Sequence, residues 1–87
     1  MDLQEKIKTF PQSPGIYLMK DSLGNIIYIG KSKNLRSRVR SYFQPSRQVT
    51  RKIEKLVFNI KDIDFIQTDT EFEALLLECQ YIQKLKP

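Results

Sequence analysis

The amino-acid sequence predicts a small domain of the α/β (α+β) class, with three β-strands and four helices. The first observation is the length of 87 residues, for which a single domain is the economical interpretation. The second is that short β-branched and aromatic runs alternate with segments whose apolar residues have helical spacing. The third is that only a short turn separates the first two runs, which predicts a β-hairpin.

The N-terminal third of the chain carries one short helix and this hairpin. Apolar residues at helical spacing predict a helix over residues 2–10. A segment with two prolines then leads into a strand over residues 15–20. A turn is expected over residues 21–25, and the second strand over residues 26–29.

The second strand is followed by a glycine and a basic helix. Gly30 allows the backbone either to turn or to approach a ligand closely. Ser32 or Asn34 has a side chain suited to cap a helix N-terminus, where unpaired N–H groups and partial positive charge are exposed. Strand, glycine and helix start together predict a corner that faces a phosphate.

Three elements are expected in the middle of the chain: helices over residues 33–43 and 49–58, and a strand over residues 61–68. The first of these helices has an apolar stripe that consists of Leu35, Val39 and Phe43. A second stripe on the margin of that face consists of Asn34, Arg38 and Tyr42. Residues on this margin can reach into a cleft beside the core.

The last helix is expected over residues 70–85, because Thr70 and Glu73 form a capping box at its start. One of its faces consists of Ala74, Glu78, Tyr81, Ile82 and Leu85. Glu78 is the charged residue on this stripe, and a carboxylate there is costly unless it is paired, hydrogen-bonded or metal-bound. The pattern leaves open an ion pair with an arginine of the second helix or a functional carboxylate.

The composition excludes several kinds of catalytic chemistry. The chain has no histidine and a single cysteine, Cys79, so histidine-based triads, HExxH metal sites and an internal disulfide are excluded. A general base must be Glu, Asp, Lys, Tyr, Cys or a metal-bound water. No secretory signal or transmembrane run is present, which favours a cytoplasmic protein. Residues 86–87 do not look like a natural terminus, so we expect residues 1–87 to be one domain of a longer protein.

The positive charge is concentrated in one part of the chain. Residues 31–55 contain nine basic side chains and one acidic side chain, a net charge of +8, whereas the whole chain carries +5. Such a block favours a polyanionic partner, above all nucleic acid. On charge alone, a solvated surface face explains the block equally well.

Four sequence blocks, in order, resemble the GIY-YIG nuclease family. They are residues 14–17 (PGIY), 28–35 (YIGKSKNL), 38–43 (RVRSYF) and 73–78 (EALLLE). The resemblance covers nearly the whole chain and is greatest to the branch that acts in nucleotide excision repair, where this domain is N-terminal. Ser32 stands where that branch usually has alanine, and the asparagine that usually follows the last proline lies beyond the sequence.

The resemblance implies a three-stranded antiparallel sheet flanked by helices, in agreement with the elements above. It implies an endonuclease that uses Mg²⁺ or Mn²⁺ to hydrolyse a DNA phosphodiester, on the 3′ side of a lesion. The implied substrate is damaged double-stranded DNA, delivered as a UvrB–DNA complex. No membrane partner is expected, and the isolated domain is expected to be a monomer.

The resemblance, with the stripes above, assigns catalytic roles to Tyr17, Tyr28, Lys31, Arg38, Tyr42 and Glu78. Glu78 is expected to bind the metal and Arg38 to clamp the phosphate. Tyr28, with Tyr17 beside it, acts as general base or orients the water by hydrogen bonding. Lys31 adds positive field, and Tyr42 positions the phosphate or the water. Backbone shape is the role expected of the two motif glycines, Gly15 and Gly30.

Six further basic residues are expected to contact the DNA backbone without reading sequence: Lys33, Arg36, Arg40, Arg47, Arg51 and Lys52. Three alternatives remain: a non-catalytic nucleic-acid-binding module, a GIY-YIG nuclease of another branch, and a protein-interaction domain. The last would not need the basic block. A pure binder has no reason to place the carboxylate of Glu78 near its phosphate face, so this residue discriminates a nuclease from a binder.

Overall fold

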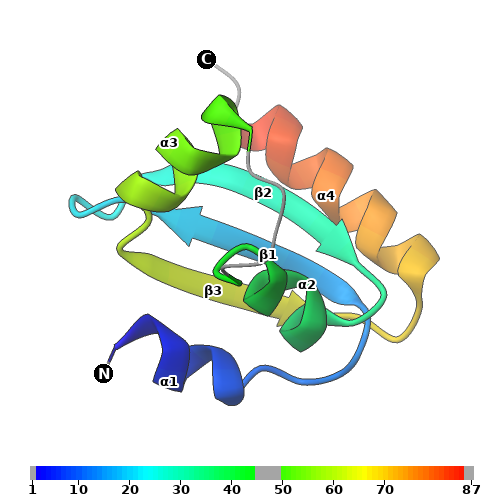
Figure 1. The fold of residues 1–87 in the computed structure, drawn as a ribbon. Coiled ribbons are helices and arrows are strands. Elements are labelled where there is room, and N and C mark those ends of the chain that lie inside the picture. Colours follow the sequence, from blue (N-terminus) through cyan, green and yellow to red (C-terminus); the bar gives the residue numbers. More distant parts are fainter. Residues whose placement is uncertain (1, 45–49, 86–87) are drawn as a thin grey trace.

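The computed structural model describes residues 2–44 and 50–85 (Figure 1). The elements follow in the order α1 (Leu3–Lys8), β1 (Gly15–Lys20), β2 (Ile26–Ser32), α2 (Leu35–Ser41), α3 (Arg51–Asn59), β3 (Asp62–Gln67) and α4 (Glu71–Leu85). The strands form an antiparallel sheet in the order β2-β1-β3. The predicted class and antiparallel sheet are confirmed. The start of the third predicted helix lies outside the described residues.

Helices cover both faces of the sheet (Figure 1). On one face, α1, α2 and α3 pack over a core that includes Tyr17 and Met19 of the central strand β1. On the other face, α4 packs over Ile16 and Leu18 of the same strand. Successive side chains of a strand point to opposite faces, so β1 supplies both layers and is buried along nearly its whole length.

Side-chain caps fix where the helices begin. Each cap accepts a hydrogen bond from the backbone N–H three residues further on, which satisfies a donor that the first helical turn leaves unpaired. The caps are Asp2, Asn34, Thr50 and Thr70. The predicted cap by Thr70 is confirmed. Of the two caps that the sequence left open for α2, Ser32 and Asn34, the structure has Asn34.

The second strand is longer than predicted. It continues beyond Ile29, through Gly30, to Ser32, because β1 offers hydrogen-bonding partners as far as Gly15. Gly30 therefore lies inside a strand, opposite Tyr17. Of the two roles that the sequence left open for it, a turn and a close approach, the turn is excluded. The helix that follows is correspondingly shorter than residues 33–43.

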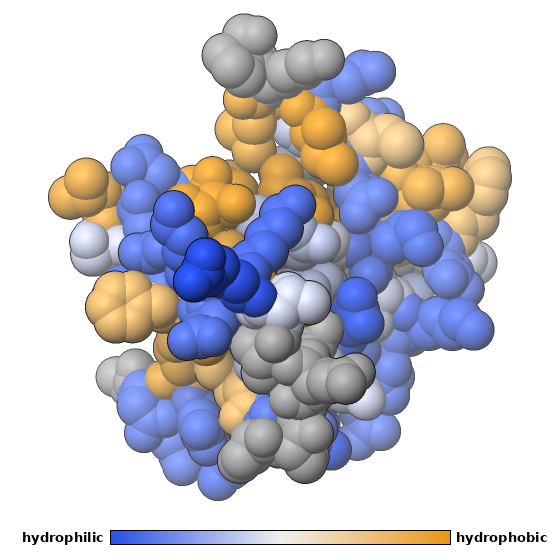
Figure 2. Space-filling view, turned by 45° about the horizontal axis from the view of Figure 1, so that its top comes forward, coloured by the Kyte–Doolittle hydropathy of each residue, from blue (hydrophilic) through white to orange (hydrophobic). Residues whose placement is uncertain are grey.

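The last helix is apolar on more than one side. Ile82 and Leu85 belong to the predicted stripe of Ala74, yet Ala74 is fully buried whereas both of them are 48% exposed. The apolar packing of α4 against the sheet extends only as far as Tyr81. Figure 2 shows hydrophobic side chains on the surface over α4, where Phe72 and Leu76 are also exposed. None of the helices in residues 2–44 and 50–85 is long and apolar enough to cross a membrane.

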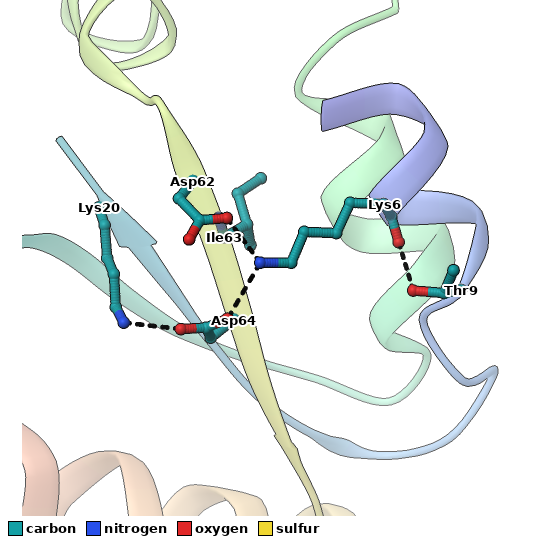
Figure 3. A network of polar contacts seen from close by, with 6 residues as sticks. All are labelled: Lys6, Thr9, Lys20, Asp62, Ile63 and Asp64. Carbon is teal, nitrogen blue, oxygen red and sulfur yellow. Dashed lines mark hydrogen bonds and ion pairs between the residues drawn. The ribbon is translucent and has the colours of Figure 1, made fainter. Parts of the chain in front are cut away.

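A chain of ion pairs ties α1 to the sheet (Figure 3). The Lys6 ammonium lies 2.6 Å from Asp62 Oδ1 and 3.2 Å from Asp64 Oδ1, and Lys20 Nζ lies 2.6 Å from Asp64 Oδ2. Hydrogen bonding to Asp62 is the main cause that raises the pKa of Lys6. Hydrogen bonding to Lys20, with a further bond from Lys6, lowers the pKa of Asp64. Both shifts favour the charged forms and the docked position of α1.

Replacing Asp64 with asparagine is expected to lower the free energy of unfolding by about 0.5–1 kcal/mol near neutral pH, since these side chains are partly exposed and screened. The folded state depresses the pKa of Asp64, so its contribution is present above the ordinary value of 3.8 and disappears as pH falls through the depressed value. Urea unfolding of both proteins across this pH range measures it. Glu5→Gln, which breaks the more exposed Lys8–Glu5 pair, is the control and should change little. A constant difference down to strongly acidic pH would contradict the assignment.

Candidate active site

Three tyrosines from different elements meet on the α2 side of the sheet. Tyr17 comes from β1, Tyr28 from β2, and Tyr42 is the residue that caps the C-terminus of α2. Their ring centroids are 5.9 to 6.5 Å apart, in tilted or edge-on arrangements. The hydroxyl groups of Tyr17 and Tyr42 are 2.8 Å apart and share a buried hydrogen bond. The three tyrosines that the sequence analysis named as candidate site residues therefore form one cluster.

The glycines of the two motifs make room for this cluster. A Cβ atom at Gly30 would lie 2.9 Å from Tyr17 Cε1 and closer still to its Cζ and hydroxyl oxygen. A Cβ atom at Gly15 would lie 2.8 Å from Leu35 Cδ1 and closer to the Ile66 carbonyl oxygen. Such contacts are too short for real side chains, so both positions need glycine for packing. The predicted role of these glycines in backbone shape is thus refined to the close approach of neighbouring groups.

The guanidinium of Arg38 belongs to the same cluster. Arg38 precedes Tyr42 by one helical turn, and its Cζ lies 5.6 Å from the centroid of the Tyr42 ring. Hydrogen bonding with the Tyr17 hydroxyl is the largest cause that raises the pKa of Arg38. The guanidinium is therefore positively charged at any physiological pH, and the tyrosines restrict its orientation.

The three phenols differ in exposure. Tyr17 is 1% exposed, Tyr42 is 7% exposed and Tyr28 is 40% exposed. Burial, and then its hydrogen bond with Tyr42, raise the pKa of Tyr17. Burial, and then the nearby Tyr42, raise the pKa of Tyr28, against a lowering effect of Arg38. Tyr17 and Tyr28 are therefore neutral near pH 7. Of the three tyrosines, Tyr28 is the most exposed to solvent.

Glu78 projects from α4 and is half-buried. The negative charge of Glu78 contributes to the raised pKa of Tyr28, so the carboxylate acts on the tyrosine cluster. Within residues 2–44 and 50–85 no ion pair or hydrogen bond joins Glu78 to another residue, and the alternative of an ion pair with an arginine of α2 is wrong. The same residues contain no group of three His, Cys, Asp or Glu side chains suited to a metal. A single free carboxylate fits Mg²⁺ or Mn²⁺, which keep water ligands and add substrate phosphate.

A cleft of about 620 Å³ opens beside the cluster, and Tyr28, Arg38 and Tyr42 form one part of its wall. Helix α3 forms another part, through residues that include Lys52, Lys55 and Asn59. Lys52 was predicted from its charge to contact DNA. The other two were not, although the spacing of all three on one helical face is visible in the sequence.

Several predicted residues lie away from this cleft. Lys31 Nζ lies 4.0 Å from Glu71 Oε1 at the start of α4. Arg36 donates a 2.8 Å hydrogen bond from Nε to the Phe10 carbonyl oxygen, so part of its role is to hold α1 against α2. Arg36 and Arg40 line a separate hollow between those helices. Lys33 and Arg51 are exposed. Arg47 lies outside the described residues.

The antiparallel sheet, with motif tyrosines on adjacent strands and an arginine on the next helix, is the arrangement of a GIY-YIG domain. Residues 13–87 match the family model described as the UvrC-like GIY-YIG domain. The chain belongs to this family, and the predicted branch is confirmed.

Similar proteins agree with this assignment. The chain is 53% identical over 87 residues to the UvrABC system protein C of Caldanaerobacter subterraneus, and 50% identical over 86 residues to that of Clostridium botulinum. It covers 14% of the length of each of these relatives.

Solved structures are similar over nearly the whole chain. The N-terminal GIY-YIG endonuclease domain of UvrC from Thermotoga maritima, bound to its catalytic magnesium, matches with a TM-score of 0.81 and 37% identity, over 97% of this chain and 90% of that one. A point mutant of that domain, bound to its catalytic divalent cation, matches with a TM-score of 0.82 over 97% of this chain and 89% of that one.

Replacing Gly30 with alanine is expected to push the Tyr17 ring away and to break its bond with Tyr42. The cost should be about 1–3 kcal/mol in the free energy of unfolding, as for other overpacked sites. Urea unfolding measures the stability, and near-ultraviolet circular dichroism reports the packing of the tyrosines.

Gly24→Ala provides the control for this change. Gly24 has a φ of +84° and no atom within 4 Å of a Cβ at that position. Alanine there should cost about 1–2 kcal/mol through backbone strain alone and leave the tyrosine spectrum unchanged. An unchanged tyrosine spectrum in Gly30→Ala would contradict the packing argument.

Proposed function

We propose that this chain is a metal-dependent DNA endonuclease domain that hydrolyses a phosphodiester bond. Within a longer repair protein, it makes the cut on the 3′ side of a lesion in nucleotide excision repair. The observation that carries the proposal is that Tyr28, Arg38 and Tyr42 line one cleft. The free carboxylate of Glu78 is near enough to contribute to the raised pKa of Tyr28. The family to which the chain belongs and the similar magnesium-bound endonuclease domain support it.

Glu78 is the residue that would hold the divalent cation. Its carboxylate is half-buried and has no competing ion pair among the described residues, so it is free to bind a metal. When bound, Mg²⁺ or Mn²⁺ supplies positive charge that polarises the phosphate and lowers the pKa of a coordinated water. Lys31, beside Glu71, adds positive potential at the start of the same helix.

Arg38 holds the scissile phosphate. A guanidinium presents planar N–H donors in a fixed geometry that matches two phosphate oxygens. The Tyr17 hydroxyl and the Tyr42 ring hold this group in place before substrate arrives. Charge that builds up on the phosphate oxygens in the transition state is then met by a donor that needs no reorganisation.

Tyr28 is the phenol that contacts the attacking water. Its 40% exposure gives the ring access to the cleft, whereas Tyr17 is too deeply buried to touch substrate. The neutral phenol oxygen accepts a hydrogen bond from the water and directs its lone pair at the phosphorus. Tyr17 is a positioning residue that fixes Arg38 and Tyr42. Tyr42 lines the cleft together with Arg38 and Tyr28.

The substrate proposed is damaged double-stranded DNA, presented as a UvrB–DNA complex. Support comes from the relatives, which are C proteins of a UvrABC system, and from the excess of positive charge between residues 31 and 55. A DNA substrate fits a cytoplasmic location, and no membrane partner is proposed. The isolated domain is proposed to be a monomer. A purely DNA-binding role leaves the half-buried carboxylate of Glu78 without a purpose.

Replacing Glu78 with glutamine is expected to reduce the 3′-side cut by at least about 100-fold, because a neutral amide binds a divalent cation much more weakly than a carboxylate. The assay uses the full-length protein on a damaged duplex preloaded with UvrB, in Mg²⁺ and in EDTA. Cutting on the 5′ side, on DNA already nicked on the 3′ side, should persist. Glu73→Gln, a change at an exposed capping position of the same helix, is the control. Undiminished 3′ cutting by Glu78→Gln would overturn the proposed nuclease site.

Replacing Arg38 with lysine tests the phosphate clamp while the charge is retained. Loss of the planar donors is expected to lower the rate of 3′ incision by about 100-fold. Arg40→Lys makes the same change on the opposite side of α2 and should leave the rate nearly unchanged. Single-turnover incision assays compare the two variants. Equal effects would indicate that Arg38 contributes only general charge.

A further inference from the structure

The cleft continues well beyond the proposed catalytic residues. Its volume of about 620 Å³ lies within the range of about 300–1,000 Å³ that small-molecule sites occupy. One phosphate with its attacking water fills a small part of this space. The remainder lies between β2 and α3, and no role in the proposed chemistry accounts for it.

The α3 wall of the cleft is basic. Lys52, Lys55 and Asn59 line the cleft, with the spacing i, i+3 and i+7 that places residues on one face of a helix. Arg51 and Phe58 of the same helix do not belong to the cleft wall. The two lysines therefore extend the positive charge of Arg38 along one continuous surface.

The cleft also has an apolar surface. Ile27, Ile53 and Leu56 line it, and each is half-buried and packs on the core beneath α3. Ile27 is the extra residue of a β-bulge, because Met19 pairs with Tyr28 whereas Lys20 pairs with Ile26. Bulges next to active sites re-aim a side chain, and this one adds an apolar group beside Tyr28.

The hairpin end of the cleft differs from the rest. Asp21 lines the cleft there, and its carboxylate also accepts hydrogen bonds from the backbone N–H groups of Leu23 and Asn25. The Asn59 side chain donates to the Lys55 carbonyl oxygen, so its own oxygen can still accept a hydrogen bond. A carboxylate repels phosphate, so the sugar–phosphate backbone is favoured at the lysine and Arg38 side, and a neutral group at the Asp21 side.

We propose that this cleft binds one nucleotide of the cut strand, next to the scissile phosphate, with its base turned out of the duplex onto Ile27, Ile53 and Leu56. Lys52 and Lys55 contact the phosphate of that nucleotide, and Asn59 meets an edge of the base. The inference rests on the proposed function and goes beyond it by assigning a nucleotide subsite.

The chemistry of the cleft favours a nucleotide over other occupants. A base offers two flat apolar faces, and stacking on a protein surface tolerates any of the four bases. An exposed aromatic ring, Tyr28, stands beside the aliphatic side chains at the same cleft. The basic rim matches a backbone phosphate and is continuous with the phosphate clamp of Arg38. Purely apolar ligands would leave this rim unused.

The experiment measures base extrusion without cleavage. The full-length protein is bound to a damaged duplex preloaded with UvrB in EDTA, with 2-aminopurine placed in turn at successive positions on the 3′ side of the lesion. Fluorescence of this base rises when it leaves the stack. A rise of several-fold is expected at one position, or at two adjacent positions.

Two variants connect the fluorescence to the cleft. Lys52→Ala with Lys55→Ala should abolish the rise and, since both contact one phosphate, reduce the slope of log affinity against log salt by about one. Asn59→Trp, at an exposed position, should fill the cleft and abolish the rise without a change of charge. The matched control, Lys61→Ala with Lys84→Ala, removes two exposed charges outside the cleft and outside the basic block, and should keep the rise.

Several outcomes would overturn the nucleotide subsite: no rise at any position with the unsubstituted protein, a rise that survives both cleft variants, or equal loss in the control. Because the readout is in EDTA, it does not depend on catalysis. A fluorescence rise together with full 3′ cutting by Glu78→Gln would reject the proposed metal site and keep the subsite. No fluorescence rise, together with loss of 3′ cutting by Glu78→Gln, would reject the subsite and keep the proposed metal site.

Discussion

The hydrogen bond between the hydroxyl groups of Tyr17 and Tyr42 is the interaction on which the rest of the site depends. It joins the central strand to the end of α2 across a distance of 2.8 Å, in a place sealed from water. A buried hydroxyl without its partner costs about 1–3 kcal/mol, so the bond holds α2 in one position over the sheet. Arg38 lies one turn before Tyr42, and its guanidinium is positioned by the same two tyrosines.

This arrangement requires glycine at two positions and the burial of two tyrosine side chains. Gly30 must leave room for the Tyr17 ring, and Gly15 must let β1 approach Ile66 and Leu35. A domain of this size has a modest core, and Tyr17 and Tyr42 belong both to that core and to the candidate site. As a result, the proposed phosphate clamp, Arg38, is oriented in the absence of substrate, which is the condition for effective electrostatic stabilisation. Glu78 approaches the same cluster from α4, which packs on the other face of the sheet.

Much of the fold and part of the site could be predicted from the sequence, because the relevant information is local. Periodicity and caps placed all the elements within a few residues, and the spacing of Arg38 and Tyr42 put both on one margin of α2. The role of Gly30 was out of reach, because it depends on the Tyr17 ring that lies against it from the adjacent strand. Likewise, Arg36 was assigned to DNA from its charge, whereas its bond to the Phe10 carbonyl oxygen depends on how α1 docks.

The basic block of residues 31–55 is divided by the fold into groups with different tasks. Arg38 and the α3 lysines share one cleft, whereas Arg36 and Arg40 lie on the far side of α2. The two groups line separate hollows, so in the proposed mechanism the charge that is continuous in sequence is divided between a local phosphate clamp and a more distant electrostatic field. In the proposed nuclease this division separates two tasks. Charge that reads no sequence supplies affinity, and the few groups held around Tyr17 supply accuracy of position.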